Sequence, residues 1–336
     1  MPHDWLIFAA VLAASGILLL AATLVLMAMV LLRPERMTDA KANVILRRLS
    51  PADLGLRYQD LHFDVRDEQT GRPLRIAAWW IPAADAGSSR TVLLIHGRGD
   101  AKVGAIAWAP TLHSLGWHVL AIDLRGHGES AGKNSTAGYW ERHDVAQVIN
   151  QFRAAHARET ATLAIFGISL GAAVAVAAAV TRDDIAGLIL EGSFGDYRQA
   201  VAAHAKMQGH SGDALRELAV RLAEWISAAD FEAVRPQDLM PDLKCPVMVI
   251  HGEGDPFIPP RDAAAMASSL KSRAHPDDVL WTIPEAGHVL GMAAVGPDEY
   301  RARVSAFLDK ITSEAAITRT APVADSVPAA GGNDRD

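Results

Sequence analysis

The pentapeptide at positions 167–171, Gly-Ile-Ser-Leu-Gly, has the residue types needed to present a serine hydroxyl for nucleophilic attack. It follows the apolar run 161–166 and precedes the alanine-rich stretch 172–181, which predicts a strand, a sharp turn and a helix. Glycine two residues before and two residues after Ser169 lets strand and helix approach without a collision of β-carbons. The hydroxyl then lies at a helix N-terminus, where the amide of Leu170 can face a developing oxyanion.

Other residues suited to such chemistry follow further apolar runs of the chain. They form four polar segments: His96-Gly-Arg-Gly-Asp100, Asp123-Leu-Arg-Gly-His-Gly-Glu-Ser130, His251-Gly-Glu-Gly-Asp255 and Glu285-Ala-Gly-His288. Ligands and catalytic groups in open α/β sheets gather at the carboxyl ends of the strands. We therefore expect these segments and Ser169 to meet at one edge of a sheet.

The elements that must position these residues alternate between extended and helical patterns. The predicted strands cover 57–65, 74–81, 91–95, 117–122, 162–166, 185–190, 246–250 and 279–283. The predicted helices lie near 106–115, 141–158, 170–181, 261–270 and 298–311. The first two strands flank a polar turn and should form an antiparallel hairpin, whereas most of the others are continuously apolar, as in strands buried on both faces. The fold class is therefore α/β, with a mostly parallel eight-stranded sheet flanked by helices.

The five motifs resemble the alpha/beta-hydrolase superfamily, and within it the capped serine hydrolases related to lysophospholipases, monoglyceride lipases and prolyl-oligopeptidase-like hydrolases. The matching motifs are H-G-x-G at 96–99, D-x-R-G-x-G-x-S at 123–130, G-x-S-x-G at 167–171, H-G-x-x-D at 251–255 and G-H at 287–288. They occur in the family's order, and the resemblance runs from about residue 60 to residue 308. It implies the alpha/beta-hydrolase fold with a helical cap.

The resemblance also implies a role for each matching residue. Ser169 corresponds to the nucleophile, His288 to the general base and acid, and Asp255 to the carboxylate that orients the histidine. The backbone amides of Arg98 and Leu170 correspond to the oxyanion hole. With these roles, an ester would acylate Ser169, and water would then release the acyl group.

Several residues within the motifs have competing interpretations. His96, His127 and His251 are expected to brace loops, and Asp123 precedes the nucleophile, out of the family's order for the acid. Many members of the family carry an apolar residue where this chain has Arg98. We hypothesise that the Arg98 guanidinium reaches the pocket and pairs with an anionic group of the substrate.

The N-terminal segment predicts a membrane helix. Trp5 to Leu32 contains no charged residue and would form a helix roughly 42 Å long, which exceeds the ~30 Å hydrocarbon core of a bilayer. A cleavable signal peptide is the competing interpretation, but its apolar region is shorter and follows basic residues. Basic residues flank only the C-terminal side of the run: Arg33, Arg36, Lys41, Arg47 and Arg48. The positive-inside rule then places the catalytic domain in the cytoplasm.

The chain divides into five predicted parts. Residues 1–36 form the transmembrane anchor, 37–55 a juxtamembrane linker, 56–194 with 242–313 the hydrolase core, 195–241 a helical cap, and 314–336 a disordered tail. The cap follows from apolar residues at helical spacing in 214–226, within a stretch that lacks any strand pattern. The tail is predicted from its Ala, Pro, Gly and Asp content without periodicity.

Composition excludes several function classes. The formal net charge is −7 and the pI about 6.0, and no stripe of basic residues interleaved with aromatics occurs, which argues against nucleic acid as a partner. The single cysteine, Cys245, cannot form an internal disulfide and is expected to be a small buried residue. No metal-ligand spacing and no dinucleotide-binding glycine pattern occurs, so no metal and no cofactor is implied. The sequence leaves the oligomeric state open.

The sequence therefore predicts a membrane-anchored serine hydrolase of carboxylic esters. Lipid-like or acyl substrates are favoured because the cap would lie near the bilayer. Peptidase, amidase and thioesterase activities use the same three residues and stay open. A catalytically silent ligand receptor on this fold is the alternative from another class. Haloalkane and epoxide hydrolases are disfavoured, since those relatives carry aspartate where this chain has Ser169.

Overall fold

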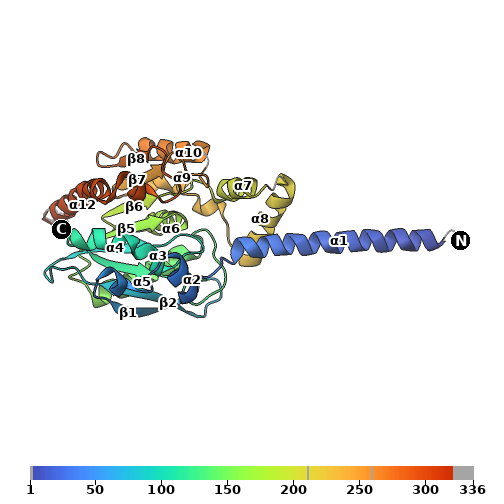
Figure 1. The fold of residues 1–336 in the computed structure, drawn as a ribbon, viewed down its shortest axis with the longest axis horizontal. Helices are drawn as coiled ribbons and strands as arrows, with labels where there is room; N and C mark the ends of the chain where they lie inside the picture. Colours follow the sequence, from blue (N-terminus) through green and yellow to red (C-terminus); the bar gives the residue numbers. More distant parts are fainter. Residues whose placement is uncertain (1–2, 210–211, 259, 321–336) are drawn as a thin grey trace, which may run out of the picture.

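One eight-stranded sheet forms the centre of the molecule (Figure 1). The computed structural model describes residues 3–209, 212–258 and 260–320. The strands lie in the order β1-β2-β4-β3-β5-β6-β7-β8. Their bounds are β1 Gln59–Arg66, β2 Pro73–Ile81, β3 Arg90–Ile95, β4 His118–Ile122, β5 Thr162–Ile168, β6 Gly187–Glu191, β7 Val247–Gly252 and β8 Val279–Ile283. The predicted α/β fold class is confirmed, and each predicted strand lies within a few residues of its observed position.

The sheet is antiparallel at one edge and parallel elsewhere. β1 and β2 form the predicted hairpin, and β2 also runs antiparallel to β4. Every other pair in the sheet is parallel, from β4 and β3 through to β7 and β8. The carboxyl ends of β3 to β8 therefore lie along a single edge, where the polar segments of the sequence follow them.

Helices cover both faces of the sheet. The helices have these bounds: α1 His3–Leu32, α2 Asp39–Ile45, α3 Lys102–Ala105, α4 Ala109–Ser114, α5 Glu141–Ala155, α6 Leu170–Ala179, α7 Tyr197–Met207, α8 Asp213–Ser227, α9 Pro236–Leu239, α10 Pro260–Ser272, α11 Gly291–Val295 and α12 Pro297–Thr320. Short 3₁₀ turns occupy 51–54, 106–108, 232–234 and 240–242. α5, α6 and α10 pack on one face, and α3, α4 and α12 pack on the other.

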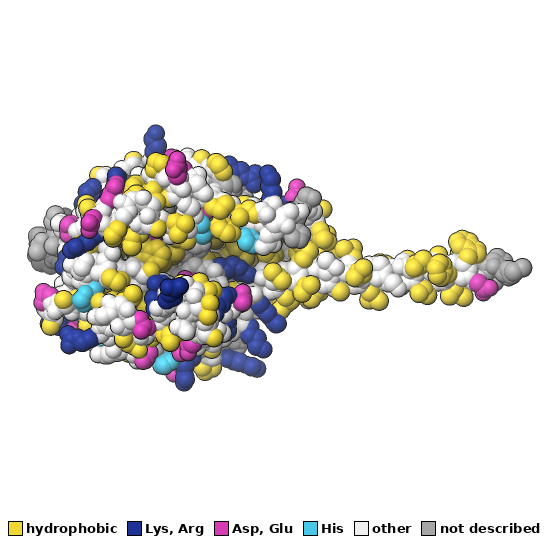
Figure 2. Space-filling view, viewed as in Figure 1, with side chains coloured by type: hydrophobic (Ala, Val, Ile, Leu, Met, Phe, Trp, Pro, Cys, Tyr) yellow, Lys and Arg dark blue, Asp and Glu magenta, His cyan; other side chains and the backbone are white. Residues whose placement is uncertain are grey.

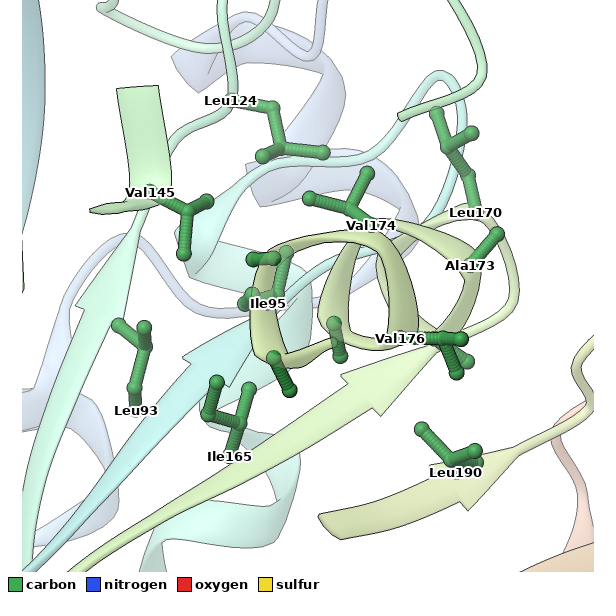
Figure 3. Packing of buried hydrophobic residues seen from close by; sticks show 14 of the residues in the cluster. Leu93, Ile95, Leu124, Val145, Ile165, Leu170, Ala173, Val174, Val176 and Leu190 are labelled. Atoms are coloured by element: carbon green, nitrogen blue, oxygen red, sulfur yellow. The ribbon is translucent and has the colours of Figure 1, made fainter. Parts of the chain in front are cut away.

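Alternation along each strand divides the core into two layers. In β3, Leu93 and Ile95 belong to the layer that contains α6, whereas Val92 and Leu94 belong to the opposite layer. Figure 3 shows α6 next to Ile95 and Ile165, with Leu93 farther from the helix in the same core layer. Every residue of α6 is buried, and most of them are alanine or valine, so the helix can pack closely against the strands. This close packing fixes the N-terminus of α6, which follows Ser169.

The predicted helix at 106–115 is wrong in detail. The chain turns earlier, at Lys102, and divides into α3, a 3₁₀ turn at 106–108 and α4. Pro110 lies in the first turn of α4, where its missing amide costs no helical hydrogen bond. The proline therefore marks the start of a new helix rather than the interior of a long one.

Helices occur in the predicted linker and at the start of the predicted tail. The segment 37–55, predicted as a linker, contains α2, where Thr38 accepts a hydrogen bond from the Lys41 amide and Ala42 is buried. α12 continues to Thr320, so 314–320, at the start of the predicted disordered tail, is helical. The remainder of that tail, 321–336, lies outside the described residues.

α1 projects from the domain (Figure 1). Asp4–Leu32 has a mean hydropathy of 2.6 with 11% of its most apolar window buried, and it is the one helix among the described residues that is long and apolar enough to cross a membrane. Figure 2 shows hydrophobic side chains along its projecting length. Pro34 follows its last turn, and Ala28 and Leu32 in that turn are fully buried in the domain.

The segment 195–241 lies beside the base of α1 (Figure 1). Its described residues form α7, α8, α9 and two 3₁₀ turns, and none of them belongs to a strand. α8 packs against the last part of α1, and its Val220 and Ala223 join the same core layer as Ala28 and Leu32. The division of the chain into core and cap stays a prediction.

Candidate active site

Ser169 occupies the sharp turn between β5 and α6. Its backbone has φ 52° and ψ −115°, a strained conformation for a residue with a side chain. Its amide donates to the Glu191 carbonyl at 2.8 Å, and its own carbonyl accepts from the Ala172 amide at 3.0 Å. Hydrogen bonds on both sides hold the turn, which places the hydroxyl at the start of α6.

The two glycines of the pentapeptide allow this turn for steric reasons. A Cβ on Gly171 would collide with the carbonyl oxygen of Ile95 on the neighbouring strand β3. A Cβ on Gly167 would collide with the backbone of Gly171 and Ala172. In both cases the obstacle is backbone, which cannot rotate away, so both positions require glycine for α6 to approach the sheet.

His288 lies beside Ser169, although 119 positions separate them in the sequence. The histidine follows β8, and its Nε2 is 2.9 Å from Ser169 Oγ. Its Nδ1 is 2.6 Å from Oδ2 of Asp255, which follows β7. The structure thus joins the three predicted side chains in one hydrogen-bonded chain.

The environment of Asp255 determines which imidazole nitrogen carries the proton. The Asp255 side chain is only 1% exposed, and its Oδ1 accepts from the amides of Phe257 and Ile258 at 2.8 and 3.1 Å. Its remaining oxygen, Oδ2, can only accept, so a proton on His288 Nδ1 satisfies this contact. Nε2 then presents its lone pair to the Ser169 hydroxyl, which is the arrangement needed to remove that proton.

Neighbouring residues enclose the imidazole. Gly192 has φ +63°, and a Cβ there would lie 3.3 Å from His288 Cε1. The Phe257 ring lies 5.1 Å from the His288 ring, and its centroid is 5.5 Å from that of His204, which stacks on it from α7. The segment predicted as a cap therefore reaches the site through one aromatic side chain.

The predicted oxyanion loop lies against Ser169. A Cβ on Gly97 would lie 3.2 Å from Ser169 Cβ and 3.8 Å from Oγ, so the chain before Arg98 lies against the serine. Leu170 is the first residue of α6, and its amide lacks an intrahelical partner. The Arg98 guanidinium donates to the Val30 carbonyl at 2.6 Å, at the end of α1. The guanidinium, which the hypothesis above assigned to an anionic substrate group, is engaged by this carbonyl.

Comparison with known proteins identifies the family of this chain. The family model Hydrolase_4, described as serine aminopeptidase, S33, matches residues 87–235. An uncharacterized protein of Mycobacterium tuberculosis is 30% identical over 220 residues, which cover 66% of this chain and 70% of the relative. The chain belongs to the alpha/beta-hydrolase superfamily.

Two further similar proteins are a lipase and an esterase. The lysophosphatidylserine lipase ABHD12 of Macaca fascicularis is 28% identical over 191 residues, 54% of this chain and 45% of that protein. The esterase Pf2001 of Pyrococcus furiosus superimposes with a TM-score of 0.66 at 23% identity, covering 83% of this chain and 98% of the esterase. The second likeness shows the shared fold. Together with the family match, these relatives support a serine hydrolase.

Glu191 is a buried acid of this hydrolase that the sequence reasoning missed. It ends β6 and is 2% exposed, and burial raises the pKa of its carboxyl group. The carboxylate accepts from Tyr300 Oη at 2.5 Å, Trp108 Nε1 at 3.0 Å and the Gly291 amide at 3.2 Å. Its backbone carbonyl accepts from the Ser169 amide. Glu191 therefore connects the turn at Ser169 to the chain three residues beyond His288.

His96 and His127, two other histidines of the motifs, form hydrogen bonds within the loops. His96 Nε2 accepts from the Leu124 amide at 3.0 Å, and burial lowers the pKa of this imidazole to about 4. Burial lowers the pKa of His127 to about 3 and also lowers that of His251. Both buried rings, His96 and His127, are therefore neutral at physiological pH, and neither has a hydrogen bond to Ser169 among the described residues.

Asp123 joins two loops at the same edge of the sheet. Its Oδ1 accepts from the Lys102 amide at 2.6 Å, and its Oδ2 accepts from Lys102 Nζ at 2.8 Å and from the Glu129 amide at 2.9 Å. Both carboxylate oxygens are thus engaged away from His288, whose Nδ1 pairs with Asp255. The geometry makes Asp255 the acid partner of the histidine.

The described residues also bear on metals and on cysteine chemistry. Across 3–209, 212–258 and 260–320 no group of three or more His, Cys, Asp or Glu side chains could hold a metal ion. Cys245 is buried, and burial raises the pKa of its thiol to about 12. A thiol that stays protonated at physiological pH is a poor nucleophile.

Proposed function

We propose that this alpha/beta hydrolase is a membrane-anchored serine hydrolase that cleaves carboxylic esters through an acyl-serine intermediate. The observation that carries the proposal is the continuous hydrogen-bonded chain from Ser169 through His288 to Asp255. A serine hydroxyl at 2.9 Å from a histidine nitrogen has a base within reach for its proton.

The reaction proceeds in two halves. Ser169 Oγ attacks the ester carbonyl carbon while His288 Nε2 takes the hydroxyl proton, and the carbonyl oxygen becomes an oxyanion. When the tetrahedral intermediate collapses, the C–O bond to the leaving alcohol breaks and His288 returns the proton to that alcohol. A water molecule then attacks the acyl-serine with His288 again as base, and the carboxylic acid leaves as Ser169 recovers its proton.

The supporting groups supply transition-state stabilisation. We infer that the amides of Leu170 and Arg98 donate to the oxyanion, and each such donor is worth about 3–4 kcal/mol in comparable sites. Asp255 holds the imidazole in the tautomer described above and stabilises its positive charge during proton transfer. No cofactor is required for these steps.

The dimensions of α1 support membrane anchoring. Residues 4–22 are exposed throughout, and 19 residues of helix span about 29 Å at 1.5 Å per residue. This length matches the ~30 Å hydrocarbon core, and the burial of α1 against the domain begins at about Thr23. Figure 2 shows Lys and Arg side chains on the domain beside the base of α1, which supports a cytoplasmic catalytic domain by the positive-inside rule.

The surface of α8 supports a lipid-like substrate. Leu218 and Trp225 lie seven residues apart on one face of α8 and are 52% and 79% exposed, with Arg221 between them. Large exposed apolar side chains are costly in water, whereas tryptophan and arginine are common at the membrane interface. Because α8 packs on the base of α1, this face would lie in the interfacial layer, next to a source of acyl chains.

The names of the similar proteins support ester hydrolysis first and amide hydrolysis second. One relative is named a lysophosphatidylserine lipase and one structural neighbour an esterase. The matching family model is described as a serine aminopeptidase, which favours amide cleavage as the second candidate. Both reactions use the same acyl-serine chemistry, so they differ in the leaving group that His288 protonates.

A substrate panel tests the proposal. The full chain in detergent micelles is assayed with p-nitrophenyl esters of short and long acyl chains, an acyl thioester and an aminoacyl p-nitroanilide. We expect ester turnover that Ser169→Ala lowers by at least 10⁴-fold, while Ser305→Ala, which removes an exposed hydroxyl on α12, has no effect. If the protein turns over only the anilide, amide hydrolysis replaces ester hydrolysis as the proposed activity. Ester turnover that survives Ser169→Ala would contradict the mechanism.

A further inference from the structure

The last turn of α1 is built into the hydrolase domain. The final carbonyls of a helix have no intrahelical donors, and here three of them receive donors from three separate segments. The Val30 carbonyl accepts from Arg98 at 2.6 Å, the Leu31 carbonyl from Tyr197 Oη at 3.4 Å, and the Leu32 carbonyl from the Ser135 amide at 2.7 Å. The candidate membrane helix therefore ends in hydrogen bonds to the oxyanion loop, the segment predicted as a cap, and the loop after β4.

Arg36 fixes the chain that leaves this helix. Its guanidinium donates to the carbonyls of Gly128 at 2.6 Å, Ser130 at 2.8 Å and Gly132 at 2.7 Å. These carbonyls belong to the loop after β4, which lies beside the active-site edge of the sheet. Because Leu32 is buried and Arg36 is held in this way, the end of α1 and its Val30 carbonyl are fixed relative to the domain.

The contact between Arg98 and Val30 is electrostatically favourable. The carbonyl end of a helix carries partial negative charge, and a guanidinium there is stabilised by it. The guanidinium forms this hydrogen bond at 2.6 Å although Arg98 is exposed. This bond ties the side chain of one oxyanion-loop residue to the end of α1.

The loop that carries the Arg98 amide is held on both sides of that residue. The Gly97 carbonyl lies 2.7 Å from His96 Nδ1 and accepts from the Asp100 amide at 3.3 Å. Glycine lies on both sides of Arg98, and Gly99 adopts φ +70°, a conformation that glycine reaches readily. A Cβ on Gly99 would lie 3.7 Å from the Glu35 carbonyl, while Gly97 packs against Ser169 on the other side. The loop is thus held between the nucleophile and the chain that leaves α1, with the Arg98 side chain as its tether.

We propose that Arg98 is a positioning residue through which α1 orients the oxyanion hole. The Val30 carbonyl holds the guanidinium, the guanidinium holds the loop, and the loop aims the amide of the same residue at the oxyanion. α1 then has a second role, as a part of the site rather than an anchor alone. This inference rests on the proposed serine hydrolase function.

The role predicts a specific kinetic effect. Oxyanion contacts strengthen as charge develops in the transition state, so loosening the loop lowers kcat and leaves KM nearly unchanged. The loss is the same for neutral and anionic esters because the guanidinium does not contact substrate. A guanidinium that bound an anionic substrate group would instead raise KM for the anionic ester alone.

The experiment uses the full chain in detergent micelles with p-nitrophenyl butyrate and the anionic p-nitrophenyl succinate. We expect Arg98→Met to lower kcat about 30-fold on both esters, a fraction of the roughly 10²–10³-fold effect of losing an oxyanion donor, with KM within about twofold. Arg98→Lys keeps a cation at the helix end and should recover part of kcat. Arg33→Met is the matched control, since it removes an exposed arginine one residue beyond α1.

The outcomes separate the inference from the proposed function. Full kcat in Arg98→Met, or a loss confined to KM for the succinate, overturns the positioning role while wild-type turnover upholds the hydrolase. Absence of turnover in the wild type contradicts the proposed function itself. The melting temperature of each variant is measured to check that it folds. Should Arg98→Met fail to fold, Arg98→Lys decides, because a reduced kcat at unchanged KM and unchanged pH profile supports the tether and a full kcat contradicts it.

Discussion

Replacing Asp255 with asparagine tests the orientation of the imidazole, because the structure dictates how the new amide must lie. Oδ1 of Asp255 accepts from the amides of Phe257 and Ile258. In Asp255→Asn the side-chain oxygen must keep this position, since an NH₂ group there would oppose two N–H donors. The NH₂ group therefore faces His288 Nδ1.

This forced orientation changes the tautomer of His288. Nδ1 can no longer donate and must accept from the asparagine, so the ring proton moves to Nε2. Nε2 is 2.9 Å from Ser169 Oγ and would then offer the serine a proton instead of a lone pair. The base is lost although the geometry is kept. A tautomer error of this kind costs about 10⁴-fold in kcat, equivalent to about 5.4 kcal/mol in the activation free energy.

The assay is the kcat of Asp255→Asn for p-nitrophenyl butyrate in micelles, with the melting temperature measured in parallel. Asn closely matches Asp in size and retains both amide contacts, so we expect a melting temperature near that of the wild type. Asp123→Asn serves as the comparison, because that carboxylate braces two loops and does not contact His288. A kcat for Asp255→Asn within tenfold of the wild type would refute the reasoning.

Three further predictions concern packing, pH and topology. In Gly171→Ala the new Cβ meets the Ile95 carbonyl, so α6 must shift and carry Ser169 with it, and we expect kcat to fall about 100-fold, measured on the same ester. Burial raises the pKa of Asp262 to about 6. The folded chain then binds this proton more tightly than the unfolded chain. The free energy of unfolding of the wild type therefore falls by up to about 3 kcal/mol as the pH rises from 4 to 6. Asp262→Asn should remove this loss. The melting temperature of the variant minus that of the wild type, measured by scanning fluorimetry, should be several degrees larger at pH 7.5 than at pH 4. Added protease should leave the catalytic domain intact in whole cells and digest it in inverted vesicles, as followed by immunoblot. The reverse pattern would place the domain on the outer side of the membrane.

The motifs at the ends of the strands could be predicted from the sequence because local patterns specify them. The apolar run before Ser169 and the glycines around it encode a strand, a turn and a helix within about twenty residues. Each remaining motif also follows its own strand, and the parallel sheet then brings the strand ends together. Proximity of Ser169, Asp255 and His288 is thus a consequence of strand order.

The features missed by sequence reasoning depend on contacts between distant positions. Glu191 resembles an ordinary strand end, and its partners Trp108 and Tyr300 lie 83 and 109 positions away. Arg36 was expected in a polar flank, but its guanidinium reaches carbonyls more than ninety positions later. A contact between the Arg98 side chain and substrate is only a hypothesis from the sequence, and in the structure its acceptor is a backbone carbonyl of α1, which has no sequence signature. Each contact becomes visible only when the fold places both partners together.

Covalent labelling of Ser169 tests the central claim most directly. The full chain in micelles is treated with a fluorophosphonate, digested, and mapped by peptide mass spectrometry, with His288→Ala treated in the same way. We predict a single phosphonate adduct on Ser169 in the wild type and a labelling rate at least 10³-fold lower in His288→Ala. An unlabelled wild type, an adduct on another residue, or equal labelling of both proteins would contradict activation of Ser169 by His288.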